Sequence, residues 1–103
     1  MINYKKASKK DLPILTEFEI KRVTSSVKDN LEKLKLIASI NEYITTNYQE
    51  YTIIYYFLKP IGCYMISNNK LDKWYVVEEH QKLENKILKK INRDLNLRKD
   101  GKK

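Results

Sequence analysis

His80 and Cys63 are the single histidine and the single cysteine of the chain, and both types often act as bases or nucleophiles. Histidine titrates near the working pH, so His80 could be a general base, but it falls in a polar segment with no visible carboxylate partner. Cys63 lies in the apolar run 61–66, where a buried, inert thiol is commoner than a nucleophile. Neither residue alone indicates a catalytic centre.

The same counts restrict the metal chemistry open to the chain. One cysteine excludes an internal disulfide and a zinc site built from several cysteines, and one histidine leaves no pair for a metal. We therefore expect no metal site.

A formal net charge of +8 gives the chain a strongly basic balance. That balance is compatible with a polyanionic partner (nucleic acid, a membrane surface or a phosphate-bearing cofactor) and equally with a solvated basic surface. Much of the excess lies near the two ends, at Lys5, Lys6, Lys9, Lys10, Lys89, Lys90, Arg93, Arg98, Lys99, Lys102 and Lys103. No known motif for reading RNA or DNA accompanies the charge. Nucleic-acid binding is therefore less favoured than the two functional interpretations that follow below.

The first half of the chain predicts a short strand and two helices. Residues 2–7 alternate weakly, and Ser8 with Asp11 has the form of a capping box, which predicts the start of a helix. Leucine, phenylalanine and valine then recur at spacings of three and four up to Val23. After a polar interruption, a second amphipathic pattern over residues 31–44 predicts a helix that ends near Asn47.

The second half predicts three strands and a last helix. Residues 51–58, 61–67 and 71–77 are rich in β-branched and aromatic side chains, with Lys59-Pro60 and Asn68-Asn69 as the expected turns. From Leu83 onward the apolar spacing becomes helical. In strand 71–77, alternation directs one of Trp74 and Tyr75 into the core.

The length of 103 residues and the hydrophobic content of 42% suit one modest core. We expect residues 1–97 to form a single domain and residues 98–103 a disordered basic tail. No apolar run approaches the ~20 residues of a membrane-spanning helix, and residues 1–6 lack the apolar segment of a secretory signal. A cytoplasmic protein without membrane contact is therefore expected.

Three phrases, in the order in which they occur, resemble the GNAT N-acetyltransferases. Residues 7–13 (Ala-Ser-Lys-Lys-Asp-Leu-Pro) look like the family's first strand-to-helix junction. Residues 59–64 are similar to its second hairpin, where a turn leads into an Ile-Gly pair, and residues 71–81 look like its fourth strand and the loop that follows. The resemblance covers residues 2–97. It implies an α+β fold, α/β in some schemes, with an antiparallel sheet of about four strands and three flanking helices in the order β-α-α-β-β-β-α.

The resemblance also implies acetyl-CoA as the cofactor and acetyl transfer to an amine that the sequence does not identify. In the family the pantetheine arm pairs with the fourth strand, which corresponds here to Tyr75, Val76 and Val77. The pyrophosphate binds backbone N–H groups at the next helix start, in a loop that corresponds here to Gln81, Lys82, Leu83, Glu84, Asn85 and Lys86. Glu84 and Lys86 stand where the family has glycines. By the same resemblance, Asp72 on the fourth strand is the candidate acceptor for the amine's proton.

The family continues with a fifth strand, whereas this sequence stops after the helix that follows strand 71–77. The resemblance therefore predicts an open sheet edge at 71–77, which a homodimer or another chain could complete. A gene shortened by a premature stop is one explanation of this ending. The alternative interpretation is a catalytically inactive remnant or binding module that acts through the open edge or the basic surface.

Two acidic residues of the first helix, Glu17 and Glu19, fall beside the family's acceptor site. Acidic side chains on a helix are mostly exposed, so the sequence predicts that both are solvated.

Overall fold

The computed structural model describes the backbone of residues 1–101 and the side chains of residues 1–96. Its elements follow the predicted order, with short 3-10 helices (η) at three junctions. They are β1 (Ile2–Lys6), η1 (Lys9–Asp11), α1 (Leu12–Thr24), α2 (Asn30–Asn47), η2 (Tyr48–Glu50), β2 (Tyr51–Tyr56), β3 (Lys59–Ser67), β4 (Lys70–Val76), η3 (Glu78–Leu83) and α3 (Glu84–Gly101).

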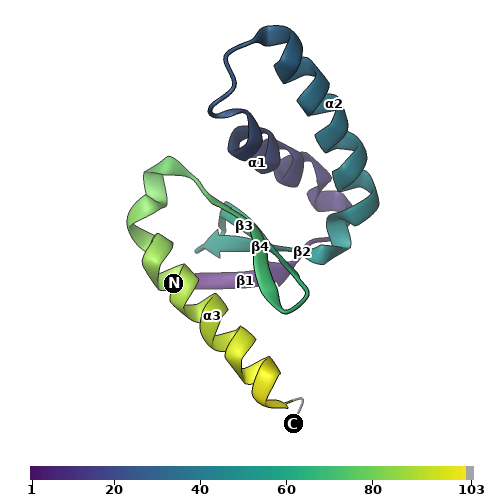
Figure 1. Ribbon diagram of the computed structural model, residues 1–103. Coiled ribbons are helices and arrows are strands. Elements are labelled where there is room, and N and C mark those ends of the chain that lie inside the picture. Colours follow the sequence, from purple (N-terminus) through teal and green to yellow (C-terminus); the bar gives the residue numbers. More distant parts are fainter. Residues whose placement is uncertain (102–103) are drawn as a thin grey trace.

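The four strands form one antiparallel sheet in the order β1-β2-β3-β4. This confirms the predicted α+β fold class, including the three consecutive strands and the helices on the sheet faces. β1 and β4 are the edge strands, so the strand that the sequence places at an open edge does lie at one. Figure 1 shows α1 and α2 on one side of the sheet and α3 on the other.

Each face of the sheet has its own apolar core. Under α1 and α2 the core includes Leu15, Phe18 and Ile44, which are at most 2% exposed. On the α3 side it is formed around Ile87 and Ile91, which pack against the inner strands. Trp74 and Tyr75 divide between these two cores, because neighbouring strand residues point to opposite faces.

The capping box predicted at Ser8 is present, and it begins the 3-10 helix η1, which leads into α1. Asp11 Oδ2 accepts the Ser8 backbone N–H at 2.8 Å and the Ser8 hydroxyl at 3.1 Å. Pro13 follows in the first turn of α1, where a missing N–H costs little. This junction sets the direction in which α1 crosses the sheet.

The turn between β2 and β3 differs from the sequence prediction. Its two residues are Phe57 and Leu58, whereas Lys59 and Pro60 already belong to β3. Phe57 has φ 58°, the left-handed value that a tight hairpin needs at its first turn position. Pro60 is accommodated beside a shift in the β2–β3 register. The predicted Asn68-Asn69 turn is confirmed, with φ values of 54° and 62°.

The last helix extends past Leu97, where the sequence predicts the end of the domain, as far as Gly101. Residues 102–103 of the predicted tail lie outside the described residues. Over the described part of the chain, no helix is long and apolar enough to cross a membrane.

Candidate functional site

A cleft lies where the C-terminal end of α1 faces the end of β4 and the start of η3. It has a volume of about 590 Å³ and is lined by Lys21, Arg22, Thr24, Ser25, Tyr75, Val76, Glu78 and Gln81. A hollow of about 420 Å³ shares Lys21, Tyr75 and Glu78 with it. We call the two together the β4-edge cleft. They bring residues 21–25 next to residues 75–81, which lie about fifty positions further along the chain.

The floor of the cleft includes the free edge of β4. The Val77 N–H donates to Ile61 O at 2.8 Å, so Val77 faces β3. Backbone groups of successive strand residues point to opposite sides, so the N–H and C=O of Val76 point away from the sheet. The carbonyl is capped, because Gln81 Nε2 donates to Val76 O at 2.8 Å. The Val76 N–H thus points to the free edge of β4, and Val76, of whose surface 2% is exposed, lines the cleft.

Gly62 of β3 fixes the position of this edge. A Cβ at Gly62 would overlap the Tyr75 carbonyl oxygen of β4, so only glycine lets the two backbones approach this closely.

Arg22 lines the cleft and is held from behind by Glu19, one turn earlier on α1. Its Nε lies 3.1 and 3.2 Å from the two carboxylate oxygens, and its Nη2 lies 2.6 Å from Oε2. These hydrogen bonds raise the pKa of Arg22, so the guanidinium stays charged. Its Nη1 takes no part in the pair. The arrangement gives the cleft a positioned donor for a carbonyl or an anionic group.

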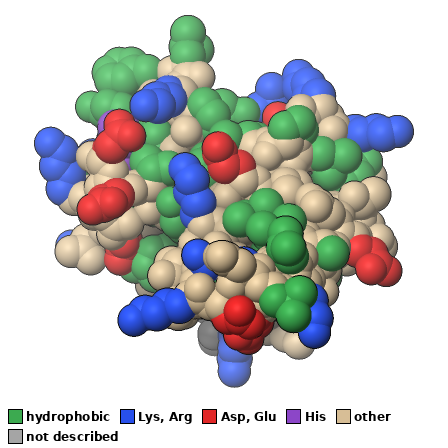
Figure 2. Space-filling view, turned by 90° about the horizontal axis from the view of Figure 1, so that it is seen from above, with side chains coloured by type: hydrophobic (Ala, Val, Ile, Leu, Met, Phe, Trp, Pro, Cys, Tyr) green, Lys and Arg blue, Asp and Glu red, His purple; other side chains and the backbone are tan. Residues whose placement is uncertain are grey.

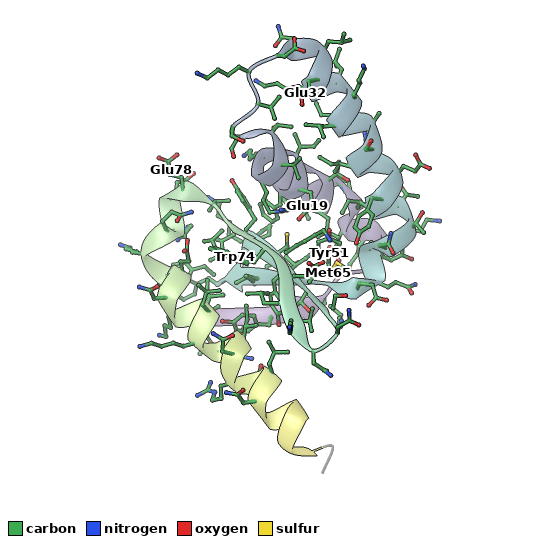
Figure 3. The ribbon with its side chains drawn as sticks, in the orientation of Figure 1. Glu19, Glu32, Tyr51, Met65, Trp74 and Glu78 are labelled. Carbon is green, nitrogen blue, oxygen red and sulfur yellow. The ribbon has the colours of Figure 1, made fainter. Side chains whose placement is uncertain are left out.

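Glu19 is buried, with only 3% of its surface exposed, so the prediction that it is solvated is wrong. The physical reason is its partner, since a carboxylate can be buried when a guanidinium neutralises it and satisfies both oxygens. The signal was in the sequence: Glu19 follows Leu15 by four residues and precedes Arg22 by three, on the apolar stripe of the helix. Figure 3 shows Glu19 and Tyr51 between α1 and the sheet.

Cys63 and Tyr51 lie in the core beneath the Glu19–Arg22 pair. Both side chains are fully buried. Burial raises the pKa of the Cys63 thiol and of the Tyr51 phenol far above their usual values, and the charge of Glu19 raises both further. Cys63 therefore stays protonated at neutral pH, and its predicted burial is confirmed.

Two other sequence candidates lie outside the cleft lining. Asp72, the proposed proton acceptor, is exposed near the start of β4, and its Oδ2 lies 2.9 Å from Lys73 Nζ. His80 packs against Tyr56, with ring centroids 5.2 Å apart. By contrast, Glu78 is the carboxylate that lines both hollows of the cleft, with Glu79 in the smaller one, and sequence reasoning missed it. Its position directly after β4 was the available signal.

The segment assigned by resemblance to the pyrophosphate is divided between two helices. Gln81, Lys82 and Leu83 end η3, and Glu84, Asn85 and Lys86 form the first turn of α3. Leu83 and Lys86 line a different cleft, on the α3 side of the sheet. Among the described residues, no cluster of three or more His, Cys, Asp or Glu side chains could hold a metal ion.

No protein-family model and no curated protein matches the sequence. Solved structures do match the fold. A possible acetyltransferase from Clostridium difficile 630 aligns over 90% of this chain and 70% of its own, with a TM-score of 0.59 and 16% identity. The chain has the fold of an acetyltransferase. PaiA N-acetyltransferase from Thermoplasma acidophilum, in complex with coenzyme A, aligns over 95% of this chain and 74% of its own, with a TM-score of 0.57 and 20% identity. At these identities the likeness shows the acetyltransferase fold, and a fold by itself does not determine an activity.

Proposed function

We propose that the protein is an acetyl-CoA-dependent N-acyltransferase that binds its donor in the β4-edge cleft and transfers the acetyl group to an amine. The observation that carries this proposal is the edge strand β4, whose residues Tyr75 and Val76 line a cleft and whose Val76 N–H points away from β3. An extended amide chain can pair with such an edge as an added strand would. A solved structure with the same fold, PaiA N-acetyltransferase, contains coenzyme A, which supports an acyl-CoA as the donor.

The residues present fit the pantetheine part of the cofactor. Tyr75, Val76 and Val77 line the two hollows of the cleft and offer backbone groups together with apolar surface. When bound, acetyl-CoA supplies an activated thioester. The chain's own contribution is to hold the arm on β4 and to direct the Arg22 guanidinium toward a carbonyl oxygen.

The residues after β4 do not fit the pyrophosphate equally well. Glu78 and Glu79 occupy the first turn of η3, where unpaired N–H groups would otherwise attract an anion. Glu84 adds a third carboxylate in place of a glycine. A carboxylate about 5 Å from a phosphate costs on the order of 1 to 3 kcal/mol at an intermediate dielectric. We therefore propose weak, salt-sensitive donor binding, assisted by Lys21 and Lys82.

We propose Glu78 as the group that accepts the proton of the amine, because it is the carboxylate that lines both hollows. Asp72, the candidate from the resemblance, is paired with Lys73 and lies four residues before Val76. A strand rises about 3.3 Å per residue, so Asp72 could accept a proton from an amine near Val76 only through bridging water. Replacing either carboxylate by its amide distinguishes the two: the base is the one whose loss lowers kcat without weakening acetyl-CoA binding.

A second candidate function is a binding module that has lost transfer activity. Gln81 caps the Val76 carbonyl that an added strand would use, and η3 presents acidic rather than glycine residues. Such a protein would act through its open sheet edge or its basic surface.

Calorimetry with acetyl-CoA at low and high salt separates the two candidates. We expect a dissociation constant well above micromolar, with tighter binding by Glu84→Gly and Glu78→Gln and weaker binding by Lys21→Glu. Lys35→Glu on α2 makes the same charge change at an exposed residue outside the cleft and serves as the control. Tight, salt-independent binding by the wild type would contradict the inactive-module reading. Absence of acetyl-CoA binding by the wild type and every variant would contradict the proposed acyltransferase.

A further inference from the structure

A second cleft lies on the α3 side of the sheet, between α3 and the free edge of β1. Its volume is about 740 Å³, larger than that of either hollow of the β4-edge cleft. Side chains from α3, β1 and β2 line it, including Lys86, Lys89, Lys90, Arg93, Tyr4 and Tyr56. We call it the α3–β1 cleft, and its four cations the basic stripe.

Among the described side chains of α3, the basic stripe lies on one flank of the helix. Its members follow each other at spacings of three, one and three, so they share one side of the helix. Among the described side chains of α3, the other exposed residues are the uncharged Asn85, Asn92 and Asn96, and Asp94, whose side chain is 44% exposed, pairs with Lys90. Charge that serves only solubility mixes both signs, as on the face of the molecule that Figure 2 shows, where Lys, Arg, Asp and Glu side chains are interspersed.

Three of the four cations have no acidic partner among the described side chains. Lys90 pairs with Asp94 at 2.6 Å, and its ammonium lies 4.3 Å from the centre of the Tyr4 ring. Lys86, Lys89 and Arg93 are exposed and form none of the ion pairs of the described residues. Their positive potential is therefore uncompensated within a concave surface, which concentrates it.

Aromatic and backbone groups complete the lining. The Tyr4 and Tyr56 rings are both half-buried in the cleft wall. Since β1 is an edge strand whose Ala7 N–H donates inward to Tyr51 O, alternation directs the N–H groups of Tyr4 and Ile2 to the free edge. The cleft thus combines cations for phosphates with flat rings for bases.

We propose that the α3–β1 cleft binds single-stranded nucleic acid, with consecutive phosphates along the basic stripe and a base against the tyrosine rings. A cationic groove beside aromatic side chains is the combination by which proteins hold single strands without sequence reading. A single strand is favoured over a duplex because its bases are free to stack on protein rings. This site is separate from the β4-edge cleft, with which it shares no lining residue.

The test is fluorescence anisotropy with a labelled oligothymidylate of about twelve nucleotides, a length within the usual range for one single-strand site. With about three phosphates neutralised, the affinity should fall with salt at a log–log slope of about −2 between about 50 mM and 200 mM. The double variant Lys89→Gln/Arg93→Gln should bind about tenfold more weakly. Its matched control, Lys28→Gln/Lys35→Gln, removes the same charge from exposed positions outside this cleft and should bind within about twofold of the wild type, the usual effect of a distant surface charge.

Three further arms identify the ligand and the site. An abasic oligomer of equal length should bind at least severalfold more weakly, and equal binding would overturn the base contact. Displacement of the oligomer by ATP at a similar concentration would assign the cleft to free nucleotides and would contradict single-stranded nucleic acid as its ligand. Excess acetyl-CoA should leave the oligomer bound, and competition would overturn a separate site. Equal losses in the two double variants, or no binding at low salt, would overturn the proposal as a whole.

Discussion

Tyr51 places its hydroxyl in the core beside Cys63 and the Glu19–Arg22 pair, with no hydrogen-bond partner among the described residues. A buried polar atom that lacks a partner costs about 1 to 3 kcal/mol. Tyr51→Phe should therefore increase the free energy of unfolding by about 1 kcal/mol, a rise in Tm of roughly 4 to 8 °C for a domain of this size. Thermal unfolding followed by circular dichroism measures it.

The control for this prediction is Tyr48→Phe. The Tyr48 hydroxyl only accepts an exposed hydrogen bond from Gln49 Nε2 at 3.3 Å, so its loss should change Tm little. A lower Tm in Tyr51→Phe would contradict this prediction, because it would show that the Tyr51 hydroxyl forms a hydrogen bond with a polar group or a water molecule.

Alkaline pH should destabilise the protein through the same cluster. Burial raises the folded-state pKa of both Cys63 and Tyr51, so the folded protein binds these protons more tightly than the unfolded chain does. The stability they contribute is complete below their unfolded pKa values of about 8.5 and 10, and it is lost as the pH rises above them. The slope approaches about 1.4 kcal/mol per pH unit for each group. Cys63→Ala should remove the loss of stability that begins near pH 8.5, which urea unfolding at a series of pH values measures. The same dependence of stability on pH in Cys63→Ala and the wild type would contradict this prediction.

The burial of Cys63 could be predicted from the sequence, because an apolar strand surrounds it on both sides. The burial of Glu19 could not be predicted from residue type, since isolated carboxylates belong in water. Only the pairing with Arg22, combined with the position of both on the apolar stripe of α1, accounts for it.

At the scale of elements, periodicity was sufficient to predict the helices and strands, because each has one face in an apolar core. The β2–β3 turn was misplaced for a local reason. Lys59-Pro60 has the turn-forming residue, yet the chain turns two residues earlier and holds Phe57 at a positive φ. Pairing of Tyr51–Tyr56 with β3 fixes that register, and intrinsic turn propensity does not reveal it.

Gly62 is the residue through which β3 determines the shape of the cleft. In Gly62→Ala the new Cβ overlaps the Tyr75 carbonyl oxygen, so β4 must move outward. We expect a loss of stability on the order of 2 kcal/mol, within the usual range for overpacking, together with weaker acetyl-CoA binding. Urea unfolding and calorimetry measure the two effects. Ser67→Ala, on the same strand but outside the cleft, should change neither, and wild-type behaviour of Gly62→Ala would contradict the close approach.

At the scale of the whole molecule, the sheet leaves the outer edges of β1 and β4 free, and each edge borders a cleft. The sequence contained the strands and the cations that form these sites. It could not predict the clefts themselves, because they depend on how α1 meets the end of β4 and how α3 crosses toward β1. The carboxylate Glu78 became a candidate only through that arrangement.

In the absence of a bound acyl donor, we expect the free β4 edge to support a homodimer, as the sequence predicted, with the edges of two copies paired. Alternation directs the N–H of Trp74 outward, so Trp74→Pro removes an edge donor without removing a bond to β3. Light scattering should give a dimer for the wild type and for Trp74→Ala, which loses the same ring, but a monomer for Trp74→Pro. A monomeric wild type, or an unaffected Trp74→Pro dimer, would contradict this interface.

The central claim is that the free edge of β4 receives the acyl donor, and amide-resolved NMR tests it most directly. Titrating the ¹⁵N-labelled protein with acetyl-CoA should shift the amide resonance of Val76 more than those of the α3–β1 cleft, and should slow hydrogen exchange at Val76, because its N–H gains an acceptor. Shifts that centre on Lys86, Lys89 and Arg93 and leave Val76 unchanged would contradict the account.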